Sequence, residues 1–170
     1  MNKFVKKAEL FANVAIIVVA ILLAAVLVQS YLLRRPTTQA RPTVQIRAGT
    51  RLSLPDVDWN YNGKTLVMAL STKCHFCTES APFYQRVAQE RSRNLNLRLV
   101  AVFPQQSAES EEYLKGLGVA VDEVKQSELG QFGVSGTPTL ILLNNHGIVE
   151  NSWLGRLNDD KESEVLRLLN

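Results

Sequence analysis

The chain has 170 residues, of which 46% are hydrophobic, and a formal net charge of +3. This length suits one compact domain with an appendage and is too short for two full domains. The excess positive charge lies in residues 1–35, which carry five Lys or Arg and one acidic residue, whereas residues 36–170 carry fourteen and fifteen. The larger part of the chain therefore lacks the basic surface typical of nucleic-acid-binding proteins. Two cysteines are also too few for a small secreted domain held together by many disulfides.

Residues 10–33 contain no charged side chain and consist mainly of Ala, Val, Ile and Leu. As a helix rising about 1.5 Å per residue, this segment would reach about 36 Å, enough to cross a hydrocarbon core of about 30 Å. We predict a transmembrane helix over 10–33, preceded by a short cytoplasmic tail over 1–9. A cleaved signal peptide is the alternative, because three lysines precede the apolar stretch. The stretch is longer than a usual signal-peptide core, however, and no small-x-small cleavage site follows it.

Residues 34–50 are rich in Pro, Thr, Gln and Arg, which predicts a linker between the membrane and a domain over 51–170. Apolar runs and helical periods then alternate along the domain. They predict strands over 65–70 and 97–103 with a helix over 78–93 between them, a helix over 107–117, an extended piece over 119–121, a helical turn over 127–132, strands over 139–143 and 148–154, and a helix over 159–169. The last two strands flank Asn144-Asn145-His146-Gly147, a turn sequence that predicts an antiparallel hairpin.

Cys74 and Cys77 lie where the first buried strand is expected to end and a helix to begin. The free N–H groups and partial positive charge of a helix N-terminus favour a thiolate, so we expect a lowered pKa for Cys74. The two-residue spacing places both sulfurs in one helical turn, where the second can attack a mixed disulfide formed by the first. The pair therefore predicts a dithiol redox site. Half of a zinc site is an alternative, but zinc needs four ligands and the chain offers only His75 and His146 as histidines.

Over residues 50–170 the sequence resembles the thioredoxin superfamily, in particular its membrane-anchored thiol-disulfide oxidoreductases of the TlpA and ResA kind. The resemblance rests on Cys74-His75-Phe76-Cys77 after a strand, on Pro82 in the next helix, and on Gly136-Thr137-Pro138-Thr139 before the hairpin. It implies an α/β, thioredoxin-like fold with a central mixed sheet flanked by helices, and a kink at Pro82. It also implies a cis Thr137–Pro138 bond that faces the two sulfurs and presents backbone to the substrate.

The sequence departs from this family at three positions beside the dithiol. Lys73 stands where the family commonly has Trp, and Met68 where thioredoxin has a buried acid, so the usual proton relay to Cys77 is missing. His75 takes a position where TlpA-like proteins often have Pro or Glu. Lys73 and His75 are either solvated loop residues or cationic groups that lower the pKa of Cys74 further. In the second case the pair would be more oxidising.

Two other functions are compatible with such a domain. A peroxiredoxin shares the fold, but Val67 stands where its proline would be and only Ser71 partly matches its upstream motif. A copper-handling thioredoxin-like module could bind metal through the two cysteines and His146. Such families usually separate their cysteines by three residues rather than two.

We therefore predict a thiol-disulfide oxidoreductase in which Cys74 attacks, Cys77 resolves, and Thr137 and Pro138 bind the substrate. It would use no organic cofactor and no metal. Its expected partners are protein thiols or disulfides and a membrane or soluble redox partner, without nucleic acid.

The expected location is the cell (inner) membrane, with a single span and the domain on the extracytoplasmic, periplasmic side. The charges that flank residues 10–33 are balanced and do not decide the orientation. The redox chemistry favours a domain outside the cytoplasm. Soluble reductants keep thiols reduced in the cytosol, whereas a tethered dithiol on the oxidising side can exchange electrons with membrane partners. The TlpA-type members that the sequence resembles also face the periplasm or the cell exterior.

Overall fold

The computed structural model describes residues 16–24, 46–54, 57–59 and 63–170. The chain forms two units, Met1–Pro42 and Thr43–Asn170. In the first unit, residues 16–24 are helical and expose their side chains. Within the described ranges, no helix is both long enough and apolar enough to span a bilayer. The tail predicted over 1–9, most of the transmembrane helix over 10–33 and most of the linker over 34–50 lie outside the described residues, so these assignments stay predictions.

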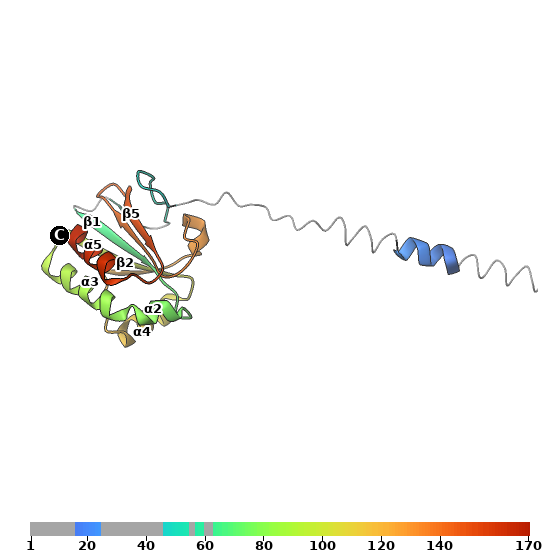
Figure 1. Ribbon diagram of the computed structural model, residues 1–170, viewed down its shortest axis with the longest axis horizontal. Helices are drawn as coiled ribbons and strands as arrows, with labels where there is room; N and C mark the ends of the chain where they lie inside the picture. Colours follow the sequence, from blue (N-terminus) through green and yellow to red (C-terminus); the bar gives the residue numbers. More distant parts are fainter. Residues whose placement is uncertain (1–15, 25–45, 55–56, 60–62) are drawn as a thin grey trace, which may run out of the picture. The chain divides into compact units, whose positions relative to one another are not determined.

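The second unit is built on one five-stranded sheet with strand order β3-β2-β1-β4-β5 (Figure 1). The strands are β1 (Lys64–Ala69), β2 (Leu97–Phe103), β3 (Glu123–Gln126), β4 (Thr139–Leu143) and β5 (Val149–Leu154). β2 is parallel to both β1 and β3, whereas β4 is antiparallel to both β1 and β5. The sheet is therefore mixed, as predicted. All but the first residue of β1 and all of β4 are buried, which explains why both sequences read as unbroken apolar runs.

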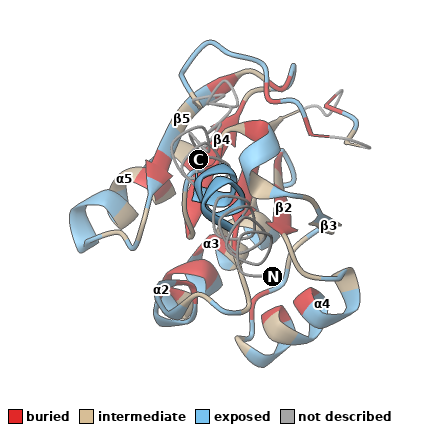
Figure 2. Cartoon of the chain, turned by 90° about the vertical axis from the view of Figure 1, so that its right-hand side faces the viewer, coloured by how far each residue is buried: buried red, intermediate tan, exposed pale blue. Residues whose placement is uncertain are grey.

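Two apolar clusters cover the two faces of this sheet, because successive side chains of a strand point to opposite sides. In β1, Leu66 and Met68 belong to one cluster, and Val67 and Ala69 to the other. The helices α3 (Ala81–Arg93), α4 (Ser107–Gly116) and α5 (Asp159–Leu169) contribute to the first cluster. Residues 46–54 and 57–59 and the short 3₁₀ helix η1 (Leu129–Phe132) contribute to the second. Figure 2 shows the buried residues concentrated in the strands and on one side of the helices.

Two predicted elements differ from the structure. The helix expected over 78–93 is two helices, α2 (His75–Glu79) and α3, which meet at Ser80. Pro82 lies in the first turn of α3, where a missing backbone N–H leaves no helical hydrogen bond unmade, so the chain breaks just before it. The extended piece expected over 119–121 is wrong, because the strand is β3, at Glu123–Gln126. β3 is a polar edge strand, and its pairing with β2, not its hydrophobicity, defines it.

Gly147, in the β4–β5 turn, has a φ of +73°, and a Cβ built on it would lie 2.6 Å from Cγ of Trp59. Gly155 has a similar φ of +84° but open space around it. Gly155→Ala should therefore lower the free energy of unfolding by about 1–2 kcal/mol, the cost of a left-handed backbone. Gly147→Ala should lower it by about 1–3 kcal/mol more, because the new methyl group overlaps Trp59. Urea unfolding of both variants measures the difference, and equal losses would contradict the close approach of Trp59.

Candidate active site

Cys74 lies at the N-cap of α2, directly after the turn that follows β1. Its backbone is extended, with φ −95° and ψ 111°, and its sulfur accepts a hydrogen bond from the backbone N–H of Cys77 at 3.2 Å. A cysteine thus takes the place that Ser, Thr or Asp usually fills at the start of a helix. The predicted position of Cys74 at a strand-to-helix junction is confirmed.

The two sulfurs differ in exposure. Cys77 is fully buried and belongs to the apolar cluster beneath the helices, whereas Cys74 is only partly buried. This difference follows from α2 itself, since its first turn directs Cys77 inward and leaves the N-cap at the surface. The more accessible sulfur is therefore the one that precedes the helix.

The segment before β4 completes the site. The carbonyl oxygen of Thr137 accepts a hydrogen bond from Sγ of Cys74 at 3.3 Å, across 63 positions of sequence. The Thr137–Pro138 bond is cis, as the family resemblance implied. Two hydrogen bonds hold this segment, from the Gly155 N–H to the Pro138 carbonyl at 2.7 Å and from the Thr139 hydroxyl to the Gly136 carbonyl at 2.7 Å. Four of the predicted site residues, Cys74, Cys77, Thr137 and Pro138, thus meet in one place.

The surroundings give the two thiols opposite pKa shifts. At Cys74, burial raises the pKa, but hydrogen bonds from the side chains of Cys77 and Thr137 and from the backbone of Cys77 and Phe76 together lower it below its ordinary value. At Cys77, burial and the neighbouring Cys74 raise the pKa to about 12, although the Ser71 backbone opposes this. The thiolate therefore forms more readily at Cys74 than at an ordinary cysteine, whereas Cys77 keeps its proton near neutral pH.

The two other predicted site residues, Lys73 and His75, are exposed. The His75 imidazole lies 3.1 Å from a carboxylate oxygen of Glu79, one helical turn later. The backbone N–H of Lys73 donates to the hydroxyl of Ser71. The groups that lower the pKa of Cys74 are hydrogen-bond donors of other residues, and the proposed tuning by Lys73 and His75 stays a prediction.

His146 does not join the cysteines. It is exposed in the turn at the far end of β4 from Pro138, and β4 has five residues, which span about 17 Å. Across the part of the chain that the structure describes, no three His, Cys, Asp or Glu side chains are grouped as metal ligands. Among these described residues, the zinc and copper alternatives that used His146 therefore have no third ligand grouped with the cysteines.

Sequence reasoning missed the residues that hold the loop before Cys74. The Gln105 side chain accepts from the Thr72 N–H at 3.3 Å and donates to the Ser71 hydroxyl at 3.1 Å. The Thr72 hydroxyl donates to Glu109 at 2.7 Å. Gln105 follows β2, the parallel neighbour of β1, and the carboxyl ends of adjacent parallel strands meet at one edge of a sheet. That topological rule is the signal that could have found Gln105.

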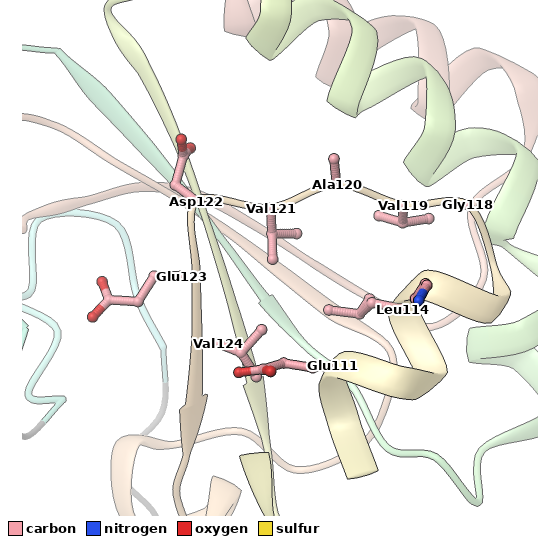
Figure 3. A pocket seen from close by; sticks show the side chains of 10 residues that line it. Glu111, Leu114, Gly118, Val119, Ala120, Val121, Asp122, Glu123 and Val124 are labelled. Carbon is pink, nitrogen blue, oxygen red and sulfur yellow. The ribbon is translucent and has the colours of Figure 1, made fainter. Parts of the chain in front are cut away.

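A cavity of about 490 Å³ opens beside α4 and the edge strand β3 (Figure 3). Its lining includes Leu114, Val119 and Val124, with the carboxylates of Glu111 and Asp122 among the polar groups. Neither cysteine lines it. The cavity is thus separate from the dithiol.

Comparison with known proteins places the fold. No family model matches the chain, and no curated protein matches it. Solved structures do match, among them the thioredoxin domain of a thiol-disulfide oxidoreductase from Bacteroides vulgatus (14% identity, TM-score 0.59), covering 74% of this chain and 100% of that one. A thiol-disulfide oxidoreductase from Bacteroides fragilis (19%, 0.56) covers 73% and 100%, and StoA from Bacillus subtilis (17%, 0.54) covers 71% and 96%. The chain therefore has a thioredoxin-like α/β fold.

The opposite pKa shifts predict which cysteine reacts first. In the reduced protein, iodoacetamide should alkylate Cys74 with a pH midpoint below that of an ordinary cysteine, because its thiolate forms at lower pH. Cys77, with a pKa of about 12, should stay unmodified at pH 8, where about one molecule in 10⁴ carries its thiolate. Mass spectrometry of the alkylated peptides between pH 5 and pH 9 would measure both. Faster labelling of Cys77 would contradict the assignment.

Proposed function

We propose that this protein is a thiol-disulfide oxidoreductase in which Cys74 is the attacking sulfur and Cys77 the resolving sulfur. One observation carries the proposal: a partly exposed thiol with a lowered pKa lies at a helix N-cap, beside a buried thiol with a raised pKa. The thioredoxin-like fold supports it, since the similar solved structures from Bacteroides species are described as thiol-disulfide oxidoreductases.

The exchange proceeds in two displacements. The Cys74 thiolate attacks one sulfur of a substrate disulfide, the disulfide bond breaks, and the departing sulfur takes up a proton. Cys77 then loses its proton and attacks the Cys74 sulfur. A Cys74–Cys77 bond forms, the bond to the substrate breaks, and the substrate leaves with two thiols. The substrate gains two electrons and the protein loses two, and the reverse sequence oxidises a substrate dithiol.

The surface around Cys74 favours a protein substrate. Phe76, between the cysteines, is 54% exposed, and Leu154, at the end of β5 beside Gly136, is 63% exposed. Such apolar side chains beside an accessible sulfur suit contact with a polypeptide. The backbone of Thr137, next to Pro138, lies beside the Cys74 sulfur, and in this proposal an extended substrate segment pairs with it. We assign substrate binding to Thr137 and Pro138.

We further propose that residues 10–33 anchor the protein in the cell membrane as a single span. The tail over 1–9 would then lie in the cytoplasm, and the linker over 34–50 and the domain over 51–170 outside it. The uncharged apolar sequence supports this arrangement, as does the helical conformation of residues 16–24. The oxidising side of the membrane also suits a tethered dithiol.

The assignment of roles predicts an asymmetric trap. Cys77→Ala should accumulate mixed disulfides between Cys74 and cellular proteins, because the attack still occurs but the resolving thiol is missing. Cys74→Ala serves as the matched control and should give at least about tenfold less adduct, because the remaining thiol is buried. Non-reducing gels with and without dithiothreitol would show the adducts. Adducts that depend on Cys77 instead would reverse the two roles.

The membrane arrangement predicts the result of a protease experiment. Protease added to intact spheroplasts should digest the domain and leave a membrane-embedded stub, because the domain lies outside the membrane. A cytoplasmic protein probed in the same sample is the control for intact membranes. A domain that is cut only after permeabilisation would show the opposite orientation.

A further inference from the structure

The hydroxyl of Tyr84 is buried without a hydrogen-bond partner. Among the described residues, it is the one buried side-chain polar atom without a hydrogen-bond partner, and Tyr84 as a whole is only 1% exposed. An unsatisfied buried group costs about 1–3 kcal/mol, and phenylalanine would fill nearly the same volume without that cost. The hydroxyl therefore has no structural reason to be there in the resting site.

Tyr84 lies beneath the dithiol. It follows Cys77 by seven residues, across the junction of α2 and α3 at Ser80, and both side chains belong to the same buried cluster. Figure 1 shows α2 and α3 end to end. A long side chain on a helix points back over the preceding turn, and for Tyr84 that direction is the start of α3, which adjoins α2.

The electrostatics agree with this placement. Burial raises the pKa of Tyr84, the Ser80 side chain lowers it, and a negative charge on Cys77 raises it again. The Ser80 hydroxyl donates its own proton to the Phe76 carbonyl at 2.8 Å, so that proton is not available to Tyr84. Because the pKa of Tyr84 is raised, its hydroxyl keeps its proton, and Tyr84 is a hydrogen-bond donor rather than a base.

The resolving step needs such a donor. Cys77 must become a thiolate before it attacks, yet it is fully buried. Burial and Cys74 raise its pKa to about 12, although hydrogen bonds with the Ser71 backbone and the Thr137 side chain lower it. Met68, also fully buried in the same cluster, offers no donor to a sulfur anion. A charged sulfur in such surroundings is strongly stabilised by each additional hydrogen bond.

Building on the proposed exchange reaction, we propose that the Tyr84 hydroxyl donates a hydrogen bond to the Cys77 sulfur when that sulfur becomes a thiolate, and thereby speeds the resolving step. Cys77 gives its proton to water, and its electron pair forms the bond to the Cys74 sulfur. The Cys74–substrate bond breaks, and the departing sulfur takes a proton from water. Tyr84 keeps its own proton throughout.

A two-phase reaction separates this step from the first attack. The full-length reduced protein is mixed with 5,5′-dithiobis(2-nitrobenzoate), an aryl disulfide. Cys74 should release one thionitrobenzoate by attack, and Cys77 a second one by resolution. Tyr84→Phe should leave the first phase unchanged and slow the second by about tenfold, as expected for a hydrogen bond to a charged group. The same variant should unfold at higher urea concentration, because the unsatisfied hydroxyl is gone.

Tyr113→Phe is the matched control, because the Tyr113 hydroxyl already pairs with the Thr78 hydroxyl at 3.0 Å. It should leave the second phase unchanged. A Tyr84→Phe protein with an unchanged second phase, with both phases slowed, or with reduced stability would overturn the role of Tyr84. A wild-type protein without a second phase would instead show that the proposed dithiol exchange itself is wrong, so the two failures are distinguishable.

Discussion

The antiparallel pairing of β4 with β1 is the contact on which the site depends. Ala69, at the end of β1, pairs with Thr139, at the start of β4. The chain leaves β1 toward Cys74 and enters β4 from Thr137, so this register brings both segments to the same edge of the sheet. The hydrogen bond between the Cys74 sulfur and the Thr137 carbonyl is its consequence. A shift of one residue would turn the alternating side chains of β4 to the wrong faces.

The start of α2 divides one dithiol into two unlike thiols. The N-cap position surrounds Cys74 with hydrogen-bond donors at the surface, and the first turn carries Cys77 into an apolar cluster. The same short helix therefore lowers one pKa and raises the other. In the proposed exchange, a low pKa suits the sulfur that attacks and later leaves, but a high pKa slows the sulfur that must resolve. Because of this conflict, polar groups near Cys77 that stabilise its thiolate would speed resolution. Among the described residues, Tyr84 has a buried hydroxyl without a hydrogen-bond partner.

The loop before Cys74 is held from the neighbouring strand. Gln105 binds Ser71 and Thr72 at once, and Glu109 on α4 binds the Thr72 hydroxyl. These contacts fix the exit from β1 without any covalent link. The site is thus assembled from three separate parts of the chain, namely the β1–α2 turn, the β2–α4 turn and the segment before β4.

The sequence by itself determined the buried strands, the hairpin and the dithiol at a strand-to-helix junction, because unbroken apolar runs, turn residues and cysteine spacing are local signals. It also pointed to Thr137 and Pro138 through a motif. Only the tertiary structure decided where β3 lies, since a polar edge strand is defined by its partner and not by its own hydrophobicity. The contacts of Gln105 and the unsatisfied state of the Tyr84 hydroxyl were decided there too. Their hydrogen bonding depends on groups from other segments that the fold brings near, and a local sequence pattern cannot predict those groups.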